Sequence, residues 1–310
     1  MTDKKKEGQY MTPDGIVSMI LNNIGYTENH VLTRKIMEPS FGDGAFLINI
    51  VQRIISEGTR TGLSKQQITD IIQANVFGIE KDKILYQKAL ERLNSLLAVY
   101  EMPEIQWEKN LTCGDTLIEC KKHIGKYDYV VGNPPFVRVH NIPDEYRDVI
   151  KQFQFVDGMI DLYIVFYEIG INLLNDKGKL GYISPNSFMK NSSQKKFRNY
   201  LVDNKYISAI YDFKTSKIFQ DADTYTCICI LNKNKNITAE KYLRKNIVDC
   251  VREFINIDEE SALVDLFRMH LVDDVEALTE ILQILPNSMV LAKAYLLNES
   301  EKLKLDDLSC

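Results

Sequence analysis

The sequence predicts an α/β fold in which helices flank an open, mostly parallel sheet. Short apolar segments typical of buried strands alternate with longer segments of helical periodicity over residues 36–231. The first strand runs into a turn with two glycines, and the next three end in an acidic or amide side chain. Ligands of such sheets bind at the carboxyl ends of the strands, so we expect these groups to meet at one edge.

The composition indicates a large buried core and no membrane segment. Of the 310 residues 45% are hydrophobic, enough for one large domain or for a domain with a smaller appendage. No apolar run is long enough to span a bilayer and residues 1–7 are polar, so we expect a cytoplasmic protein. The six cysteines form no CxxC pair and the four histidines are scattered, which predicts reduced thiols and no metal site.

The charge is distributed unevenly along the chain. The net charge of −5 argues against a protein that binds nucleic acid unspecifically. Residues 239–310 contain 15 acidic and 8 basic residues, whereas residues 1–238 contain 28 acidic and 30 basic ones. Apolar residues recur at helical spacing between Ile247 and Leu297. We therefore expect a catalytic domain over residues 1–238 and a helical, acidic extension over residues 239–310.

A helix is expected from Asp14 onward, because Pro13 suits a first helical turn and Thr12 is placed to cap it. A plain capped surface helix accounts for this segment without any function.

Residues 36–47 predict a strand, a glycine turn and the start of a helix. Gly42 and Gly44 let the backbone turn tightly and approach a ligand, at which the positive end of the helix points. Glu38 and Pro39 depart from the fingerprint of dinucleotide-binding folds and argue against NAD. A carboxylate at this place suits a cationic ligand group such as an amine.

The next two strands also lead to carboxylates. Residues 75–80 end in Glu80, and an acid there is the usual acceptor of ribose hydroxyls in nucleoside-binding α/β folds, although a solvated strand-end glutamate is the alternative. The spacing of 36 residues from Gly44 to Glu80 is longer than the ~20 of the fingerprint, which a helical insertion over residues 60–74 would explain. Asp115 follows the third strand and is placed to accept a hydrogen bond from an adenine amino group.

The fourth strand, residues 127–132, runs into the turn Asn133-Pro134-Pro135-Phe136. The amide of Asn133 and the carbonyl of Pro134 make a two-acceptor site for an exocyclic amino group, and the ring of Phe136 offers a surface for a planar base. The alternative is that the two prolines merely end the strand and that the aromatic ring belongs to the core. This turn predicts a site for an amino-bearing base.

The remaining elements complete the sheet. Residues 137–157 are polar and irregular, and form either a loop over the site or a surface insertion. Phe219 lies between the last two strands, and is either a second wall opposite Phe136 or a hydrophobic plug. The other expected elements are a helix over residues 161–174, a turn over 175–178, a strand over 180–186, a basic helix over 195–202 and strands over 207–213 and 225–231.

In this order the motifs resemble those of the gamma-type amino-methyltransferases of restriction–modification systems, which methylate N6 of adenine in DNA. The resemblance covers residues 8–232 and implies a Rossmann-like, S-adenosylmethionine-dependent methyltransferase fold. Such a fold has a seven-stranded, mostly parallel sheet with helices on both faces, here followed by a C-terminal helical segment. The motifs are QYMTP (9–13), EPSFGDGAFL (38–47), GIE (78–80), GD (114–115), GNPPF (132–136), DLY (161–163), GKLGYISPN (178–186) and KIF (217–219).

The resemblance implies S-adenosylmethionine as cofactor, double-stranded DNA as substrate and a location in the prokaryotic cytoplasm. Thr12, Glu38 and Ser40 would hold the methionine end of the cofactor. Glu80 would hold its ribose and Asp115 its adenine ring. The full cofactor set that the resemblance implies is Tyr10, Thr12, Glu38, Pro39, Ser40, Gly42, Gly44, Glu80, Lys81, Asp115, Thr116, Asn133 and Pro135.

The implied catalytic set is Asn133, Pro134, Pro135 and Phe136, and Phe219 would join Asn133 and Phe136 in binding a flipped-out base. The two acceptors would make the amino nitrogen a better nucleophile, since its lone pair is otherwise delocalised into the ring. The sulfonium methyl group is already activated, so positioning supplies most of the rate and no metal is needed.

Two departures from the family pattern stand out. Phe136 replaces the commoner tyrosine, which preserves stacking. Residues 239–310 are short for a target-recognition domain and residues 301–310 resemble its entry segment, so we expect a truncated chain or one whose DNA reading belongs to a separate subunit. The alternatives are methylation of guanine N2 in ribosomal RNA, of a glutamine amide or of cytosine N4, or a non-catalytic methyltransferase-like subunit.

Overall fold

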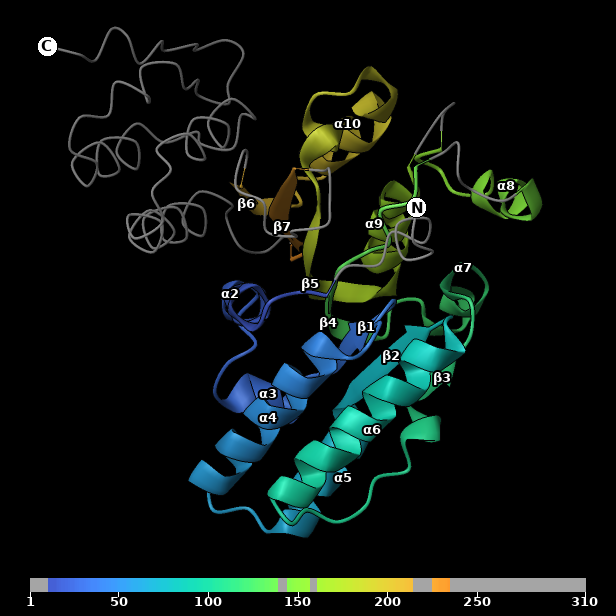
Figure 1. Cartoon of the computed structure of the whole chain (residues 1–310). Coiled ribbons are helices and arrows are strands. Elements are labelled where there is room, and N and C mark those ends of the chain that lie inside the picture. Colours follow the sequence, from blue (N-terminus) through green and yellow to red (C-terminus); the bar gives the residue numbers. More distant parts are fainter. Residues whose placement is uncertain (1–10, 139–143, 157–160, 214–224, 235–310) are drawn as a thin grey trace, which may run out of the picture.

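The structure is a computed structural model that describes residues 11–138, 144–156, 161–213 and 225–234. Its strands form one seven-stranded sheet in the order β3-β2-β1-β4-β5-β7-β6 (Figure 1). β3, β2, β1, β4 and β5 are parallel, and β7 runs antiparallel to both of its neighbours. The mostly parallel, Rossmann-like sheet is therefore confirmed. The strands are β1 Ile36–Glu38, β2 Val76–Glu80, β3 Leu111–Cys113, β4 Tyr127–Gly132, β5 Leu174–Pro185, β6 Ile207–Asp212 and β7 Thr226–Asn232.

Helices cover both faces of the sheet, as expected (Figure 1). Side chains of α2, α4, α5 and α6 pack on one face and those of α9 and α10 on the other, and each face has its own hydrophobic core. Val130 and Val131 of β4 belong to opposite cores and are fully buried, which is why this strand is a continuous apolar run. The helices are α2 Asp14–Asn23, α3 Asn29–Thr33, α4 Ala45–Arg60, α5 Lys65–Asn75, α6 Lys83–Val99, α7 Thr116–Glu119, α8 Asp144–Ile150, α9 Leu162–Leu173 and α10 Lys195–Asp203.

Local signals set the starts of the helices that position the site. Ser64 and Gln67 form a capping box at α5, the helical insertion expected before β2. At α6, the Asp82 carboxylate accepts from the backbone N–H groups of Ile84 and Leu85. The Asp82 cap lies just after Glu80, the last residue of β2, and so marks where that strand ends.

Three expectations need correction. Thr12 does not cap α2: Pro13 occupies the N-cap position without a side-chain cap, and Thr12 lies one residue earlier, buried beside a cavity. The turn over residues 175–178 lies inside β5 as a bulge, because Leu174 pairs with Tyr127 and Lys179 with Tyr129.

The segment of residues 137–157 is not irregular throughout and is not a plain surface insertion where the structure describes it. It contains α8, and the side chains of Ile150 and Phe155 are buried in the core next to α9. Burial of two large apolar side chains holds this segment against the domain.

Among the described residues, no helix is long and apolar enough to cross a bilayer, and no cluster of side chains has the make-up of a metal site. The expected extension over residues 239–310 lies outside the described residues, so this domain boundary stays a prediction.

Candidate functional site

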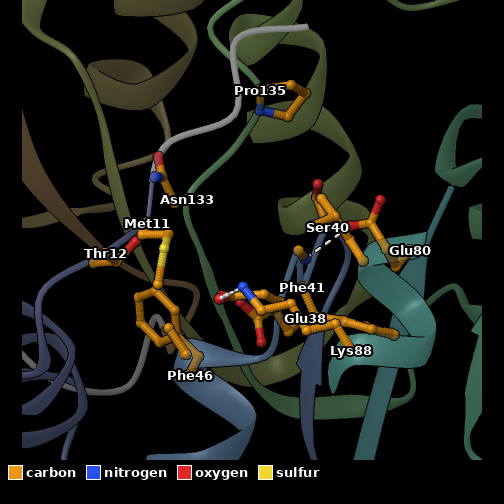
Figure 2. Close-up of a pocket in the computed structure, with 14 residues that line it drawn as sticks. Met11, Thr12, Glu38, Ser40, Phe41, Phe46, Glu80, Lys88, Asn133 and Pro135 are labelled. Atoms are coloured by element: carbon orange, nitrogen blue, oxygen red, sulfur yellow. Dashed lines mark hydrogen bonds and ion pairs between the residues drawn. The ribbon is translucent and has the colours of Figure 1, made fainter. Parts of the chain in front are cut away.

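A cavity of about 120 Å³ lies at the carboxyl ends of β1, β2 and β4 (Figure 2). It collects predicted site residues from parts of the chain that are far apart in sequence. This edge is where open parallel sheets bind ligands. The lining residues are Met11, Thr12, Glu38, Ser40, Phe41, Gly42, Asp43, Ala45, Phe46, Glu80, Leu85, Lys88, Asn133 and Pro135.

Glu38, the last residue of β1, brings a buried carboxyl group to this cavity. The side chain is 2% exposed, and its Oε2 atom has no hydrogen-bond partner among the described residues. Burial, and then the nearby Glu80 and Asp43 carboxylates, raise the pKa of Glu38 well above its usual value. A buried oxygen without a partner is costly, so this position favours a ligand group that donates hydrogen bonds or carries positive charge.

The glycine turn between β1 and α4 depends on left-handed backbone. Gly42 has φ +54° and Gly44 has φ +86°, values that side-chain-bearing residues adopt only at a cost. A Cβ on Gly44 would also lie 3.1 Å from Cβ of Ala89 on α6, whereas a Cβ on Gly42 would meet nothing within 4 Å. Gly44 thus allows α6 to approach the turn.

This difference predicts that Gly44→Ala destabilises the fold more than Gly42→Ala. Both replacements place alanine in left-handed backbone, at a cost of about 1–2 kcal/mol. Gly44→Ala adds the contact with Ala89 and should cost about 1–3 kcal/mol more. Chemical denaturation of both variants and of the parent protein measures the difference. Equal losses of unfolding free energy would mean that the packing against α6 contributes nothing.

Glu80, at the end of β2, is held by backbone donors. One carboxylate oxygen accepts from Gly42 N at 2.7 Å and the other from Asp82 N at 2.8 Å. The side chain is 4% exposed, so it is not the solvated strand-end glutamate of the alternative interpretation. Burial raises the pKa of Glu80, and the hydrogen bonds from Asp82 and Gly42 oppose that shift. Each carboxylate oxygen has a second acceptor position that a ligand hydroxyl can use.

Asp43 is a structural residue of the site that the sequence analysis missed. Its buried carboxylate forms ion pairs with Lys88 at 3.1 Å and Arg92 at 3.0 Å, both on α6. Arg92 also donates to the Asp43 carbonyl oxygen at 2.8 Å. The turn is therefore fastened to α6 by charge as well as by packing. The one signal in the sequence was two cations four residues apart, which share a helix face.

Asp115 and Lys81 lie at the neighbouring strand ends but do not line the cavity. The Asp115 carboxylate caps α7 by accepting from Leu117 N at 3.0 Å and forms an ion pair with Lys81 at 3.4 Å. Lys81 Nζ donates to the hydroxyl of Tyr146 on α8 and lies 4.1 Å from the centre of that ring. Partial burial works to lower the pKa of Lys81, but the Tyr146 hydroxyl and the Asp115 carboxylate outweigh burial and raise it.

Thr116 and Pro39, two other predicted cofactor residues, lie beside these groups. Thr116 Oγ1 donates a hydrogen bond to the carbonyl oxygen of Pro39, and this bond connects α7 to the segment after β1. Tyr10 lies outside the described residues, as does Phe219 of the predicted substrate site.

The turn after β4 is divided between the cavity and the core. Asn133 and Pro135 line the cavity, whereas Pro134 and Phe136 do not (Figure 2). Phe136 is half-buried and packs against the core on the α2–α6 face. The interpretation of its ring as part of the core therefore has structural support, and its stacking role stays a prediction. Gly132, with φ +152°, leads the chain from β4 into this turn.

The Eco57I restriction-modification methylase family matches residues 52–219, which is more than half of the chain. The chain belongs to this family. Membership confirms the resemblance to DNA methyltransferases of restriction–modification systems. The gamma type and the methylation of adenine N6 stay predictions.

Curated relatives of this Eco57I-family chain are type II restriction–modification proteins. The type II methyltransferase M.BstVI of Geobacillus stearothermophilus is 34% identical over 241 residues, which cover 75% of this chain and 43% of that protein. The type II restriction enzyme and methyltransferase RM.Eco57I of Escherichia coli is 26% identical over 280 residues, which cover 73% of this chain and 28% of that protein. The chain thus spans less than half the length of these relatives.

Solved structures share the fold of this Eco57I-family chain. The type ISP restriction-modification enzyme LlaGI, in complex with a DNA substrate mimic, matches with a TM-score of 0.60 and 19% identity over 81% of this chain and 26% of that one. The M protein of the type I restriction enzyme EcoKI matches with a TM-score of 0.55 and 17% identity, over 75% of this chain and 46% of that one. At these identities the likeness establishes the Rossmann-like methyltransferase fold and nothing finer.

Proposed function

We propose that this chain is the catalytic part of a site-specific DNA methyltransferase that transfers a methyl group from S-adenosylmethionine to N6 of adenine. Family membership supports DNA methylation within a restriction–modification system. The observation that carries the proposal is the shared cavity of Glu38, Glu80 and Asn133, each at or just after the carboxyl end of a different parallel strand.

The residues around the cavity fit the cofactor. The partnerless Oε2 atom of Glu38 suits the ammonium group of the methionine end, and Thr12 and Ser40 bring hydroxyl groups to the same cavity. Glu80, oriented by two backbone donors, suits the ribose hydroxyls. Beyond the lining residues, Asp115 is the acceptor proposed for the adenine amino group. When bound, S-adenosylmethionine supplies a methyl group activated by the sulfonium.

The turn after β4 supplies the groups that act on the target base. The side-chain amide oxygen of Asn133 and the carbonyl oxygen of Pro134 accept the two amino hydrogens of the adenine, which favours a pyramidal and more nucleophilic nitrogen. Phe136 and Phe219 stack on the extruded base, and stacking worth about 1–3 kcal/mol per base offsets part of the cost of flipping. Holding the nitrogen and the methyl group in line provides most of the acceleration.

Double-stranded DNA is the substrate that we propose, and a target-recognition module is the proposed partner. The described residues form the Rossmann-like fold of the catalytic part, and the curated relatives are more than twice as long as the matched region. We propose that the bases flanking the adenine are read by that module, on a separate subunit or elsewhere in a longer chain.

Nucleoside mass spectrometry tests the proposal. Unmethylated DNA is incubated with the chain and isotope-labelled S-adenosylmethionine, then digested, and cofactor binding is measured in parallel by calorimetry. Labelled N6-methyladenine is expected. Labelled N4-methylcytosine would contradict adenine as the target. A parallel reaction contains ribosomal RNA in place of DNA, and labelled N2-methylguanine there would favour the alternative amino group. Absence of both cofactor binding and labelled nucleoside would contradict the methyltransferase function itself.

A further inference from the structure

A basic segment, defined as residues 190–198, follows β5 at the edge of the sheet that carries the catalytic turn. β4 and β5 are paired neighbours, with Gly132 opposite Tyr182, and β5 continues three residues further to Pro185. The chain beyond Pro185 therefore begins beside the chain beyond Gly132. Figure 1 shows α10, which begins within the basic segment, beyond this end of β5.

The basic segment carries four cations and no acidic residue. Lys190, Lys195 and Lys196 are exposed, and Arg198 is half-buried. Asn191, Ser192 and Ser193 lie between Lys190 and Lys195 and are also exposed, so amide and hydroxyl donors are flanked by ammonium groups. This is the set of side chains that proteins use to contact phosphate oxygens of DNA.

These charges are not neutralised within the described part of the chain. None of the four cations forms an ion pair with a described carboxylate. The field of Lys196 reaches Glu168 of α9, but both carboxylate oxygens of Glu168 already accept from the backbone N–H groups of Gln154 and Phe155, at 2.9 and 3.0 Å. The local positive charge stands out in a chain whose net charge is −5.

The backbone that bears the cations is firmly held. Phe188 and Phe197, on either side of the lysines, are fully buried in the core next to α9. Arg198 donates to the carbonyl oxygens of Phe188 and Asn191 at 2.7 and 2.6 Å, and so closes the segment into a compact loop. A rigid anchor lowers the entropy lost when exposed side chains bind a partner.

Building on the proposed function, we propose that the basic segment binds the phosphodiester backbone of double-stranded DNA and guides the strand toward the catalytic turn. Lys190, Lys195 and Lys196 contact phosphates, and Arg198 is a positioning residue that shapes the loop. Contacts of this kind carry no sequence information, so they add affinity and register without replacing a recognition module.

The test compares the parent with three triple variants of the full chain in binding a short, unmodified DNA duplex, measured by fluorescence anisotropy across about 50–200 mM salt. The first variant is Lys190→Gln, Lys195→Gln and Lys196→Gln. The matched control is Lys109→Gln, Lys126→Gln and Lys205→Gln, whose exposed lysines precede the parallel strands β3, β4 and β6 at the opposite edge. A third variant replaces the three lysines of the basic segment with arginine.

We expect the first variant to lower the slope of log affinity against log salt by about 2 to 3, since each lost phosphate contact removes about 0.9. Affinity at the low-salt end should fall at least about tenfold. The control and the arginine variant should keep the parent slope. A first variant with the parent slope, or a parent chain that binds no duplex at low salt, would overturn the assignment.

Cofactor calorimetry on the same proteins separates this assignment from the proposed function. All variants should bind S-adenosylmethionine like the parent, because none of the replaced lysines lines the cavity. If the parent methylates DNA while the first variant keeps its salt slope, only the DNA-backbone assignment fails. If the parent neither binds the cofactor nor methylates, the proposed function fails.

Discussion

Asn133→Ala is expected to slow methyl transfer at least about 100-fold, the scale on which loss of one hydrogen-bonding group aimed at a transition state acts. The replacement removes the side-chain acceptor at the base of the turn and leaves the Pro134 carbonyl in place. It should not disturb the fold, because β4 is anchored by the fully buried Val130 and Val131 just before the turn. Single-turnover methylation of unmethylated DNA measures the effect, with calorimetry to show that cofactor affinity changes little.

Two further variants test whether the loss of activity in Asn133→Ala comes from the missing hydrogen-bond acceptor. Asn133→Asp keeps acceptor oxygens at the same place, so it should lose less activity than Asn133→Ala if acceptance of the amino hydrogens matters. Asn29→Ala removes an exposed amide at the start of α3, on a helix that contributes nothing to the cavity, and should act like the parent. Parent-like turnover by Asn133→Ala would exclude this side chain from the chemistry.

The strands and the residues at which they end were predictable because each signal is local. A strand buried on both faces is an apolar run, and the polar residue that follows marks where it ends. Glu38, Glu80 and Asn133 could therefore be assigned to one edge of the sheet from the amino-acid sequence alone.

What the sequence did not reveal depends on contacts between distant segments. Asp43 finds Lys88 and Arg92 only after α6 packs on the turn. Residues 175–178 have the composition of a free turn. They form a bulge within β5, because the flanking residues Leu174 and Lys179 both pair with β4. Thr12 has the side chain of a helix cap, but it is buried and lines the cavity instead. Local propensity cannot distinguish such outcomes.

Glu38→Gln should have two effects of opposite sign. Affinity for S-adenosylmethionine should fall about 10- to 100-fold, since a hydrogen bond to a charged group contributes about 1.5–3 kcal/mol. The ligand-free protein should become more resistant to thermal unfolding at neutral pH, because a buried group with a costly charged form is replaced by a neutral amide of the same shape. A purely structural glutamate would not show this combination.

The pH dependence of stability follows from the direction of the pKa shift. Burial, and then Glu80 and Asp43, raise the pKa of Glu38 in the folded protein above its value in the unfolded chain. The folded state therefore holds this proton more tightly, and the resulting stability is present below the unfolded pKa and is lost as pH rises through the folded one. The difference in Tm between Glu38→Gln and the parent should accordingly grow from acid to neutral pH.

Cofactor binding should have the opposite effect and lower the pKa of Glu38. An ammonium group at Glu38 favours the carboxylate, so binding releases a proton, and the affinity of the parent should rise with pH while that of Glu38→Gln stays flat. Calorimetry in two buffers of different ionisation enthalpy measures the released proton.

Glu168→Gln is the matched control: this glutamate is also buried with a raised pKa, but it holds the backbone of Gln154 and Phe155, away from the cavity. Its replacement should lower Tm and leave cofactor affinity and proton release unchanged. Equal proton release by Glu38→Gln and the parent would place the ammonium site elsewhere.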